Sequence, residues 1–192
     1  MKPISPVEVA HRFAGSVVRK GDNCVDATVG NGRDTAFLAK QVATTGKVLG
    51  FDVQSEAITN AQARLESEQL LGQVILKNYG HEELRPTLQS LGWQSLRLVM
   101  FNLGYLPGSD KSIITRTDTT LTALNTCLEY LASEGAVSIV AYRGHSGASD
   151  EYNAVQKWVT QLPAEDFFTL RFERWTISKG VSPVFFWVRR RR

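Results

Sequence analysis

The segment DATVGNGRDT, residues 26–35, follows a short apolar run and holds two glycines among acidic and hydroxyl side chains. Gly30 and Gly32 let the backbone turn tightly and approach a ligand closely. The helix predicted from Arg33 onward would offer free backbone N–H groups at its start. The segment is therefore typical of a nucleotide-type loop between a strand and a helix, although one GxG pair also occurs in ordinary turns.

The residues of this loop disfavour a dinucleotide. Thr35 stands where the third glycine of GxGxxG would be, and Asp34 puts an anion into the first helical turn, where a pyrophosphate would bind. Asp26, at the end of the predicted strand, suits a ligand that carries a cationic ammonium group. These residues favour S-adenosylmethionine over NAD as the cofactor.

The ends of the next two predicted strands carry polar residues that suit the same cofactor. Asp52 lies about 20 residues beyond Gly32, where an acidic side chain can accept hydrogen bonds from both ribose hydroxyls. Gln54 could flank the adenine, and NYGHE, residues 78–82, supplies polar groups such as His81 for the adenine edge. The three strand ends together predict a cofactor that contains a nucleoside.

The segment FNLGYLPG, residues 101–108, ends the fourth predicted strand, which faces the methyl group in a sheet of this kind. Asn102 offers a carbonyl oxygen to a substrate amine, the next turn offers a backbone carbonyl, and Tyr105 offers a ring or a hydroxyl. Two acceptors aimed at one nitrogen would direct its lone pair toward a methyl donor. The arrangement is similar to the Asn-Pro-Pro-Tyr motif of amino-methyltransferases, with Leu103 and Gly104 in place of the prolines.

Two further polar segments are expected at the same edge of the sheet. AYRGHSGASDE, residues 141–151, follows the fifth predicted strand and contains His145, a candidate for proton relay. GSDKSIITRTD, residues 108–118, is either a substrate lid or a solvated loop with a helix cap. His11 is expected to be structural or exposed.

Apolar periodicity and capping residues predict five strand–helix units followed by a hairpin. Ser5 and Glu8 form an expected capping box, and Ser55 is expected to cap the second helix of the repeating units. The predicted helices cover residues 6–18, 33–42, 55–69, 83–91, 117–133 and 149–161. The predicted strands cover residues 23–28, 47–53, 74–78, 96–103, 136–142, 167–177 and 184–190. The last two strands are too close for a crossover helix and should be antiparallel.

This pattern predicts an α/β fold. It has a seven-stranded, mostly parallel sheet with a C-terminal antiparallel hairpin strand and helices on both faces. Residues 1–192 are expected to form a single domain. Ligands of such sheets bind at the carboxyl ends of the strands, near the switch in strand order.

Composition narrows the class of protein further. No apolar run approaches the roughly 20 residues of a membrane helix, and no Cys/His cluster has metal-ligand spacing, so neither a membrane nor a metal is expected. Cys24 and Cys127 should be buried thiols in a reducing compartment. Neither lies near the end of the fourth strand, which disfavours carbon-5 pyrimidine methylation because that reaction needs a thiolate. The N-terminus lacks an apolar leader, which predicts the cytoplasm, or the plastid stroma if a transit peptide was removed.

The formal net charge of +3 is only a weak indication of an anionic partner. Residues 189–192 form a basic tail, which is either a solubilising chain end or a contact with an RNA backbone. Arg33, Arg116 and Arg143 are further candidates for phosphate contacts.

Several of these segments resemble one family over essentially the whole chain. DATVGNGRDTAFLA, GFDVQ, NYGHE, FNLGYLPG with SIIT, and YRGHSGASDE are similar to small bacterial and plastid proteins long labelled rRNA methylases. The family is now understood as tRNA methyltransferases that act on 5-aminomethyl-uridine at the wobble position. The resemblance implies a class I methyltransferase fold, S-adenosylmethionine as cofactor, the tRNA anticodon loop as partner and 5-methylaminomethyl-uridine as product, with or without a 2-thio group. A homodimer is also plausible for so small a tRNA enzyme.

The resemblance and the motifs together give three sets of candidate residues. The methyl-transfer set is Asn102, Tyr105 and His145. The cofactor set is Asp26, Thr28, Gly30, Asn31, Gly32, Asp34, Thr35, Asp52, Gln54, Gly80, His81, Asn102 and Gly104. The substrate set is Leu106, Pro107, Asp110, Thr115, Tyr142 and Gly144. One departure is the last connection, SKGVSP, which has a single proline, Pro183, where the family has an Asn followed by a proline pair.

Other functions remain compatible with the residues alone. They are rRNA base or ribose methylation, methylation of a small-molecule amine, and a nucleotide-binding module without activity. Ribose methylation usually needs a lysine-centred set, and Lys111 is the only lysine close to the end of the fourth strand. Asp26, Asp52 and Asn102 argue against an inactive module.

Overall fold

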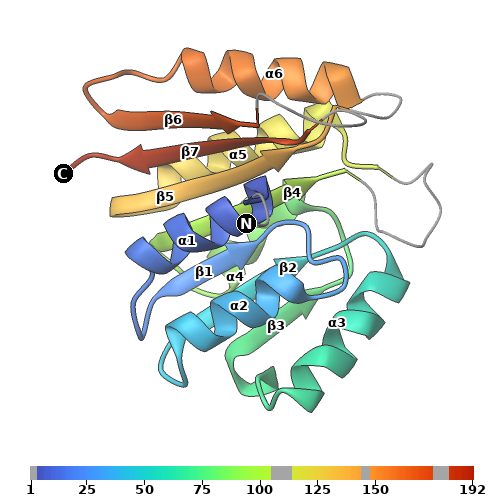
Figure 1. Cartoon of the computed structure of the whole chain (residues 1–192). Helices are drawn as coiled ribbons and strands as arrows, with labels where there is room; N and C mark the ends of the chain where they lie inside the picture. Colours follow the sequence, from blue (N-terminus) through green and yellow to red (C-terminus); the bar gives the residue numbers. More distant parts are fainter. Residues whose placement is uncertain (1–3, 105–113, 144–147, 175–181) are drawn as a thin grey trace.

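The structure, a computed structural model, describes residues 4–104, 114–143, 148–174 and 182–192. A seven-stranded sheet with the order β3-β2-β1-β4-β5-β7-β6 runs through the molecule (Figure 1). The strands are β1 (Asn23–Asp26), β2 (Lys47–Phe51), β3 (Val74–Lys77), β4 (Leu96–Leu103), β5 (Leu131–Ala141), β6 (Phe167–Glu173) and β7 (Val184–Arg190). The helices are α1 (Pro6–Val17), α2 (Arg33–Val42), α3 (Ser55–Ser67), α4 (Leu84–Ser90), α5 (Thr117–Tyr130) and α6 (Ala148–Thr160).

Strand directions confirm the predicted α/β class. The five strands β1 to β5 pair in parallel, whereas β7 is antiparallel to both of its neighbours, β5 and β6. The carboxyl ends of β1 to β5 therefore share one edge of the sheet, and the reversed β7 carries the chain terminus to the opposite edge (Figure 1).

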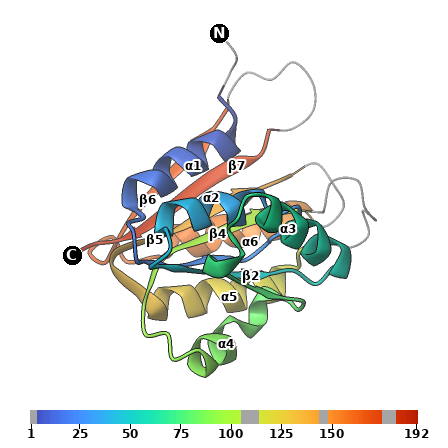
Figure 2. The same ribbon diagram turned by 90° about the horizontal axis from the view of Figure 1, so that it is seen from below.

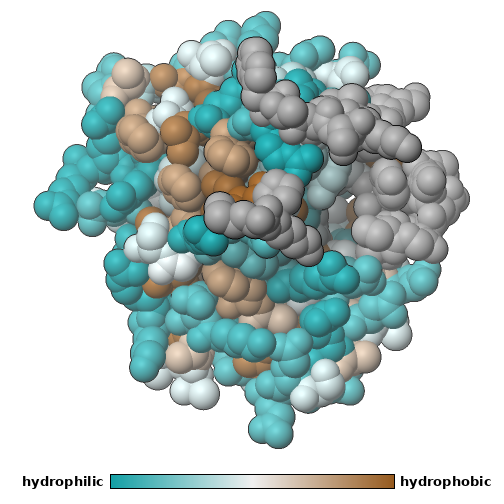
Figure 3. Space-filling view, viewed as in Figure 1, coloured by the Kyte–Doolittle hydropathy of each residue, from teal (hydrophilic) through white to brown (hydrophobic). Residues whose placement is uncertain are grey.

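Both faces of the sheet are covered by helices, because the central strands are apolar on both sides. Figure 2 shows α1, α2 and α3 on one face and α4 and α5 on the other. Along β4, Val99, Phe101 and Leu103 belong to the core beneath α4, α5 and α6. Leu98 and Met100 belong to the core beneath α1, α2 and α3. The face drawn in Figure 3 is mostly polar, and apolar residues gather on it over α1, β6 and β7.

Most element boundaries agree with the sequence prediction, and the capping box on α1 is confirmed. Ser5 Oγ accepts from the Glu8 amide at 3.1 Å, and the Glu8 carboxylate accepts from the Ser5 amide at 2.6 Å. The predicted cap on α3 is wrong, because Gln54 is the N-cap and Ser55 is already helical. Asp52 Oδ1 accepts from the Gln54 amide at 2.9 Å, which fixes the turn that begins the helix.

The start of β5 also differs from the prediction. The strand begins at Leu131, and α5 ends at Tyr130 rather than at residue 133. Glu134 has a positive φ of 61°, and the pairing of β4 with β5 shifts register between Leu96 and Leu98. This irregular entry into the strand has no periodic apolar pattern, so the sequence did not reveal it. No helix in the described ranges is long and apolar enough to cross a bilayer.

Replacement of Gly32 should cost substantial stability. Gly32 is the N-cap of α2 with φ 72°, and a Cβ there would lie 2.8 Å from Ala61 Cα on α3. We expect Gly32→Ala to lower the free energy of unfolding by roughly 3 kcal/mol, because backbone strain adds to a steric clash. Gly92→Ala is the matched control, since Gly92 has φ 68° and no atom near its Cβ position, and should cost roughly 1 kcal/mol. Urea unfolding measures both, and equal losses would show that α3 yields to the added methyl group.

Candidate active site

Three of the predicted site residues lie at the carboxyl ends of neighbouring strands. Asp26 ends β1, Asp52 follows β2, and Asn102 is the penultimate residue of β4. Because β1 lies between β2 and β4, the strand order reverses direction at this point. This is the switch point at which open α/β sheets bind their ligands.

Asp26 is a fully buried carboxylate. Its Oδ1 accepts from the Thr28 amide at 3.1 Å, and its Oδ2 accepts from Thr35 Oγ1 at 2.6 Å. Burial, with the nearby charge of Asp34, raises the pKa of Asp26 to about 7. A buried acid whose pKa is raised in this way suits a ligand that brings positive charge.

The raised pKa of Asp26 predicts a pH dependence of stability for the ligand-free protein. The folded state holds the Asp26 proton more tightly than the unfolded state, so its contribution to stability falls as pH rises through about 7. Between pH 6.5 and 8 we expect wild type to lose about 1 kcal/mol relative to Asp26→Asn.

The lowered pKa of His81 changes stability with pH in the opposite direction. Because His81 is present in both proteins, the comparison with Asp26→Asn isolates the contribution of Asp26. Thermal or urea unfolding at several pH values measures the difference between the two proteins. A constant difference across this range would contradict the assignment.

Asp52 organises the loop around the second strand end. Its Oδ2 accepts from the Gly30 amide at 2.8 Å, and its Oδ1 accepts from the Gln54 amide at 2.9 Å. Burial raises its pKa, while these two amides and His81 act in the opposite direction. Since a carboxylate has about four acceptor positions, lone pairs remain for two further donors such as ribose hydroxyls.

Beside Asp52 the structure adds apolar surface that the sequence did not single out. Val53 is 58% exposed and lies two residues after the end of β2, and Tyr79 is 38% exposed and lies two residues after the end of β3. Tyr79 also lies 5.8 Å from the Phe51 ring, centroid to centroid. Exposed large apolar side chains at a strand end suit a flat nucleobase, and they could have been recognised only by knowing which loop positions face outward.

The glycine loop is held in place by α3. Arg64 Nε donates to the Asn31 carbonyl at 2.8 Å, and Asn60 Nδ2 donates to Asn31 Oδ1 at 3.3 Å. Gly30 and Gly32 both have positive φ, as their predicted role requires. The side chain of Asn31 therefore contacts α3, while the loop backbone remains close to Asp52.

Asp34 and His81 both have protein partners. Asp34 Oδ1 lies 2.6 Å from His11 Nε2, and the His11 ring stacks on Phe37. His81 is buried, and its Nδ1 lies 2.9 Å from the Ala27 carbonyl oxygen. Because a carbonyl only accepts, Nδ1 carries the proton there, and burial lowers the pKa of His81 so that the ring is neutral. His81 thus joins the β3 loop to the end of β1.

Asn102 is half-buried and held through its backbone. Its amide donates to Thr28 Oγ1 at 2.7 Å, which fixes the end of β4 against the loop after β1. Thr28, predicted as a cofactor contact, thus has a role in placing Asn102. Six other predicted residues lie outside the described ranges: Tyr105, Leu106, Pro107, Asp110, Gly144 and His145.

The remaining predicted residues within the described ranges follow the ends of β3, β4 and β5. Gly104 follows β4, and its carbonyl accepts from the Thr115 amide at 3.1 Å. Gly80 begins the short turn before α4, and its Cβ position is blocked by the Glu82 carboxylate. Tyr142 is 37% exposed just after β5.

Glu151 is a buried residue of α6 that the sequence analysis missed. Its carboxylate accepts from Thr115 Oγ1 at 2.6 Å and from Thr120 Oγ1 at 2.7 Å. The signal for it was present, because Glu151 is in helical phase with the buried Val155 and Val159. An acidic residue in an apolar stripe predicts a buried polar contact.

The predicted phosphate contacts are mostly paired or distant. Arg143 forms an ion pair with Glu173, and Arg116 forms one with Asp118. Arg33 is exposed at the start of α2. The basic tail follows β7 to the amino edge of the parallel strands, so it lies across the sheet from Asn102.

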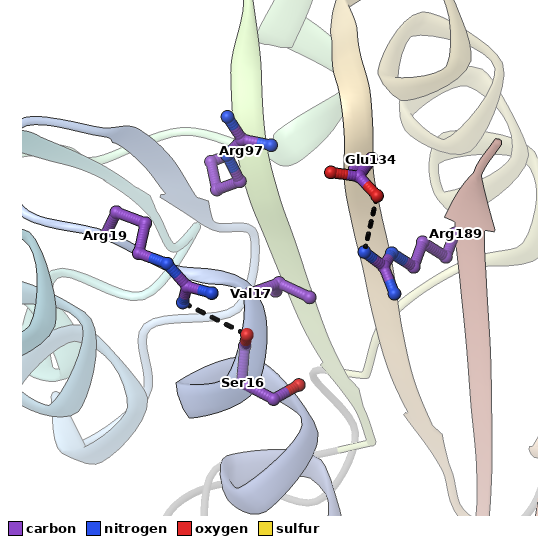
Figure 4. A pocket seen from close by; sticks show the side chains of 6 residues that line it. All are labelled: Ser16, Val17, Arg19, Arg97, Glu134 and Arg189. Atoms are coloured by element: carbon purple, nitrogen blue, oxygen red, sulfur yellow. Dashed lines mark hydrogen bonds and ion pairs between the residues drawn. The ribbon is translucent and has the colours of Figure 1, made fainter. Parts of the chain in front are cut away.

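A pocket of about 150 Å³ opens at this amino edge and is drawn in Figure 4. Its arginines already have partners: Arg189 pairs with Glu134, Arg19 donates to the Ser16 carbonyl, and Arg97 pairs with Asp22. Because the pocket lies at the amino edge of the parallel strands, it is separate from the candidate active site at their carboxyl ends.

Both cysteines are buried free thiols, as predicted. Burial raises the pKa of Cys24 and of Cys127, so neither supplies a thiolate at neutral pH. Within the described residues, no group of three His, Cys, Asp or Glu side chains could hold a metal ion.

Comparisons with known proteins agree with this geometry. Residues 48–188 match the protein family described as "Putative rRNA methylase". The chain is 36% identical over 187 residues to the chloroplastic tRNA (mnm(5)s(2)U34)-methyltransferase of Arabidopsis thaliana. That match covers 92% of this chain, and the chain spans 66% of the length of the plant protein.

Two solved structures have the same fold. The structure described as a "putative rRNA-methylase" from Clostridium thermocellum superposes with a TM-score of 0.93 at 33% identity, covering 99% of this chain and 100% of the other. The structure described as "a putative methyltransferase" from Streptococcus mutans, in complex with SAH, gives a TM-score of 0.86 at 32% identity, covering 98% of this chain and 99% of the other. The strand order described above is thus that of Rossmann-like methyltransferases.

Proposed function

Since the chain belongs to the family described as "Putative rRNA methylase", we propose that it is an S-adenosylmethionine-dependent N-methyltransferase acting on tRNA. Its substrate would be 5-aminomethyl-uridine at the wobble position, with or without a 2-thio group, and its product 5-methylaminomethyl-uridine. The observation that carries the proposal is the position of Asn102, an uncharged acceptor at the end of β4 beside the acidic loop of β1. The wobble substrate is supported by the 36% identity to the plant tRNA methyltransferase.

The residues present fit the proposed cofactor. Asp52 has lone pairs left for two ribose hydroxyls, and Val53 and Tyr79 offer apolar surface for an adenine. Asp26 is buried, and the positive charge of the cofactor would lower its raised pKa and stabilise the carboxylate. When bound, S-adenosylmethionine supplies an electrophilic methyl group. The protein has to orient the substrate amine, which is the nucleophile, and to favour its neutral form.

Asn102 would orient the substrate amine. An alkylamine with a pKa near that of lysine, about 10, is neutral in only about one molecule in a thousand at pH 7, and the protonated form has no lone pair for attack. The Asn102 carbonyl oxygen can accept a hydrogen bond from the amine N–H group. Because the amide carries no full negative charge, it does not stabilise the ammonium form as a carboxylate would. A carboxylate at this position would favour the unreactive form.

Reaching the site requires an exposed base, which an anticodon loop provides more cheaply than a duplex. This favours a wobble uridine over a base buried in a ribosomal helix. Methylation of rRNA and of small amines are the alternatives that the experiment must separate.

The direct test uses labelled S-adenosylmethionine and tRNA from cells that lack the final wobble methylation. After the reaction the tRNA is digested and its nucleosides are analysed by mass. We expect one added methyl group on 5-aminomethyl-uridine. If ribosomal RNA or a small amine accepts the methyl group while this tRNA does not, the tRNA assignment is wrong and the methyltransferase assignment stands.

A further inference from the structure

Glu151 is 4% exposed on α6, and both of its carboxylate oxygens accept hydrogen bonds from threonine hydroxyls. Burying a carboxylate costs free energy that two neutral donors offset only in part. The next positions of the same helical stripe, Val155 and Val159, are apolar. An apolar residue would therefore pack here at lower cost, which indicates that the carboxylate has a role other than stability.

The two threonines that donate to Glu151 connect it to opposite sides of the candidate site. Thr115 donates its amide to the Gly104 carbonyl at 3.1 Å, and Gly104 lies two residues after Asn102. Thr115 thus connects Glu151 to the end of β4, where the substrate amine would bind.

Thr120 connects Glu151 to the cofactor side. Its Oγ1 lies 3.4 Å from His81 Nε2. His81 Nδ1 lies 2.9 Å from the Ala27 carbonyl oxygen, adjacent to Asp26. The Glu151 carboxylate is therefore connected through Thr120 and His81 to the end of β1. It is connected through Thr115, which precedes α5, to the end of β4.

We propose that Glu151 is a positioning residue that holds the Gly104 end of β4 at a fixed distance from the cofactor loop. The effect on methyl transfer rests on the proposed function, whereas the effect on the Thr115 amide does not. The carboxylate would act through Thr115 and Thr120, the hydroxyl donors that it has among the described residues.

The experiment compares Glu151→Gln with Asp150→Asn in the full chain. Asp150 precedes Glu151 on α6 and is exposed, so its replacement removes the same charge without the buried hydrogen bonds. We expect Glu151→Gln to lower kcat by about 10- to 100-fold, because a small displacement of the acceptor is enough to slow transfer. The Kd of S-adenosylmethionine should change by less than about threefold, since Asp52 and the glycine loop remain in place.

A second measurement reads the positioning directly. Hydrogen exchange of the Thr115 amide, followed by NMR, should be at least about 10-fold faster in Glu151→Gln and unchanged in Asp150→Asn. Unchanged exchange in Glu151→Gln overturns the inference whether or not the protein methylates tRNA. Faster exchange with wild-type kcat overturns the role in methyl transfer. Inactive wild type with faster exchange in the variant refutes the proposed function and leaves the positioning of Gly104 supported.

Discussion

Replacing Asn102 by alanine should lower kcat for methyl transfer by about 100-fold or more, while the Kd of S-adenosylmethionine changes by less than about threefold. The side chain is proposed to accept from the substrate amine, so its loss removes the group that aims the nitrogen lone pair. The backbone at residue 102 is held independently by Thr28 Oγ1 and by pairing with Val140 on β5. The alanine variant should therefore keep the end of β4 in place.

Single-turnover kinetics with saturating tRNA measure the transfer step, and calorimetry measures cofactor binding. Asn153→Ala is the matched control, because Asn153 is exposed on α6. Asn102→Asp gives a second comparison, since a carboxylate would stabilise the ammonium form and should slow transfer most at low pH. Equal losses of kcat and of cofactor affinity in Asn102→Ala would contradict the assignment and place Asn102 at the cofactor.

The fold could be predicted from the sequence because strong local signals coincide. The run Leu96 to Leu103 is apolar on both faces, and the structure gives β4 those bounds. The short connection before Val184 predicted an antiparallel hairpin, which β6 and β7 form. What the sequence could not provide was the position of β7 between β5 and β6, because strand order depends on long-range pairing.

Residues of the candidate site could be predicted from the sequence only where they lie at the end of a strand. Asp26, Asp52 and Asn102 follow apolar runs, so their location at one edge follows from a parallel sheet. Glu151 is not at a strand end, and its partners Thr115 and Thr120 lie 36 and 31 residues away in the chain, so only its helical phase with apolar residues indicated burial. The charge of the basic tail is evident from the sequence, but only the reversed direction of β7 shows that the tail lies at the far edge of the sheet.

Replacing Asp52 by alanine should raise the Kd of S-adenosylmethionine by about 100-fold, because hydrogen bonds to a charged acceptor are worth roughly 1.5–3 kcal/mol each. The proposed contacts are the two ribose hydroxyls. The carboxylate also holds the Gly30 and Gln54 amides, so the variant loses part of the loop geometry as well. Turnover at saturating cofactor should fall much less than affinity, since Asn102 is fixed by Thr28 and β5.

The control for Asp52→Ala is Asp166→Ala, because Asp166 is exposed in the turn before β6, at the opposite edge. Ribose recognition and loop support can be separated with a cofactor analogue that lacks one ribose hydroxyl. If Asp52 binds the hydroxyls, wild type should bind the analogue about 10-fold more weakly than the parent cofactor, and Asp52→Ala should bind both equally. If the variant still distinguishes the two ligands as well as wild type does, Asp52 only supports the loop and the ribose is bound elsewhere.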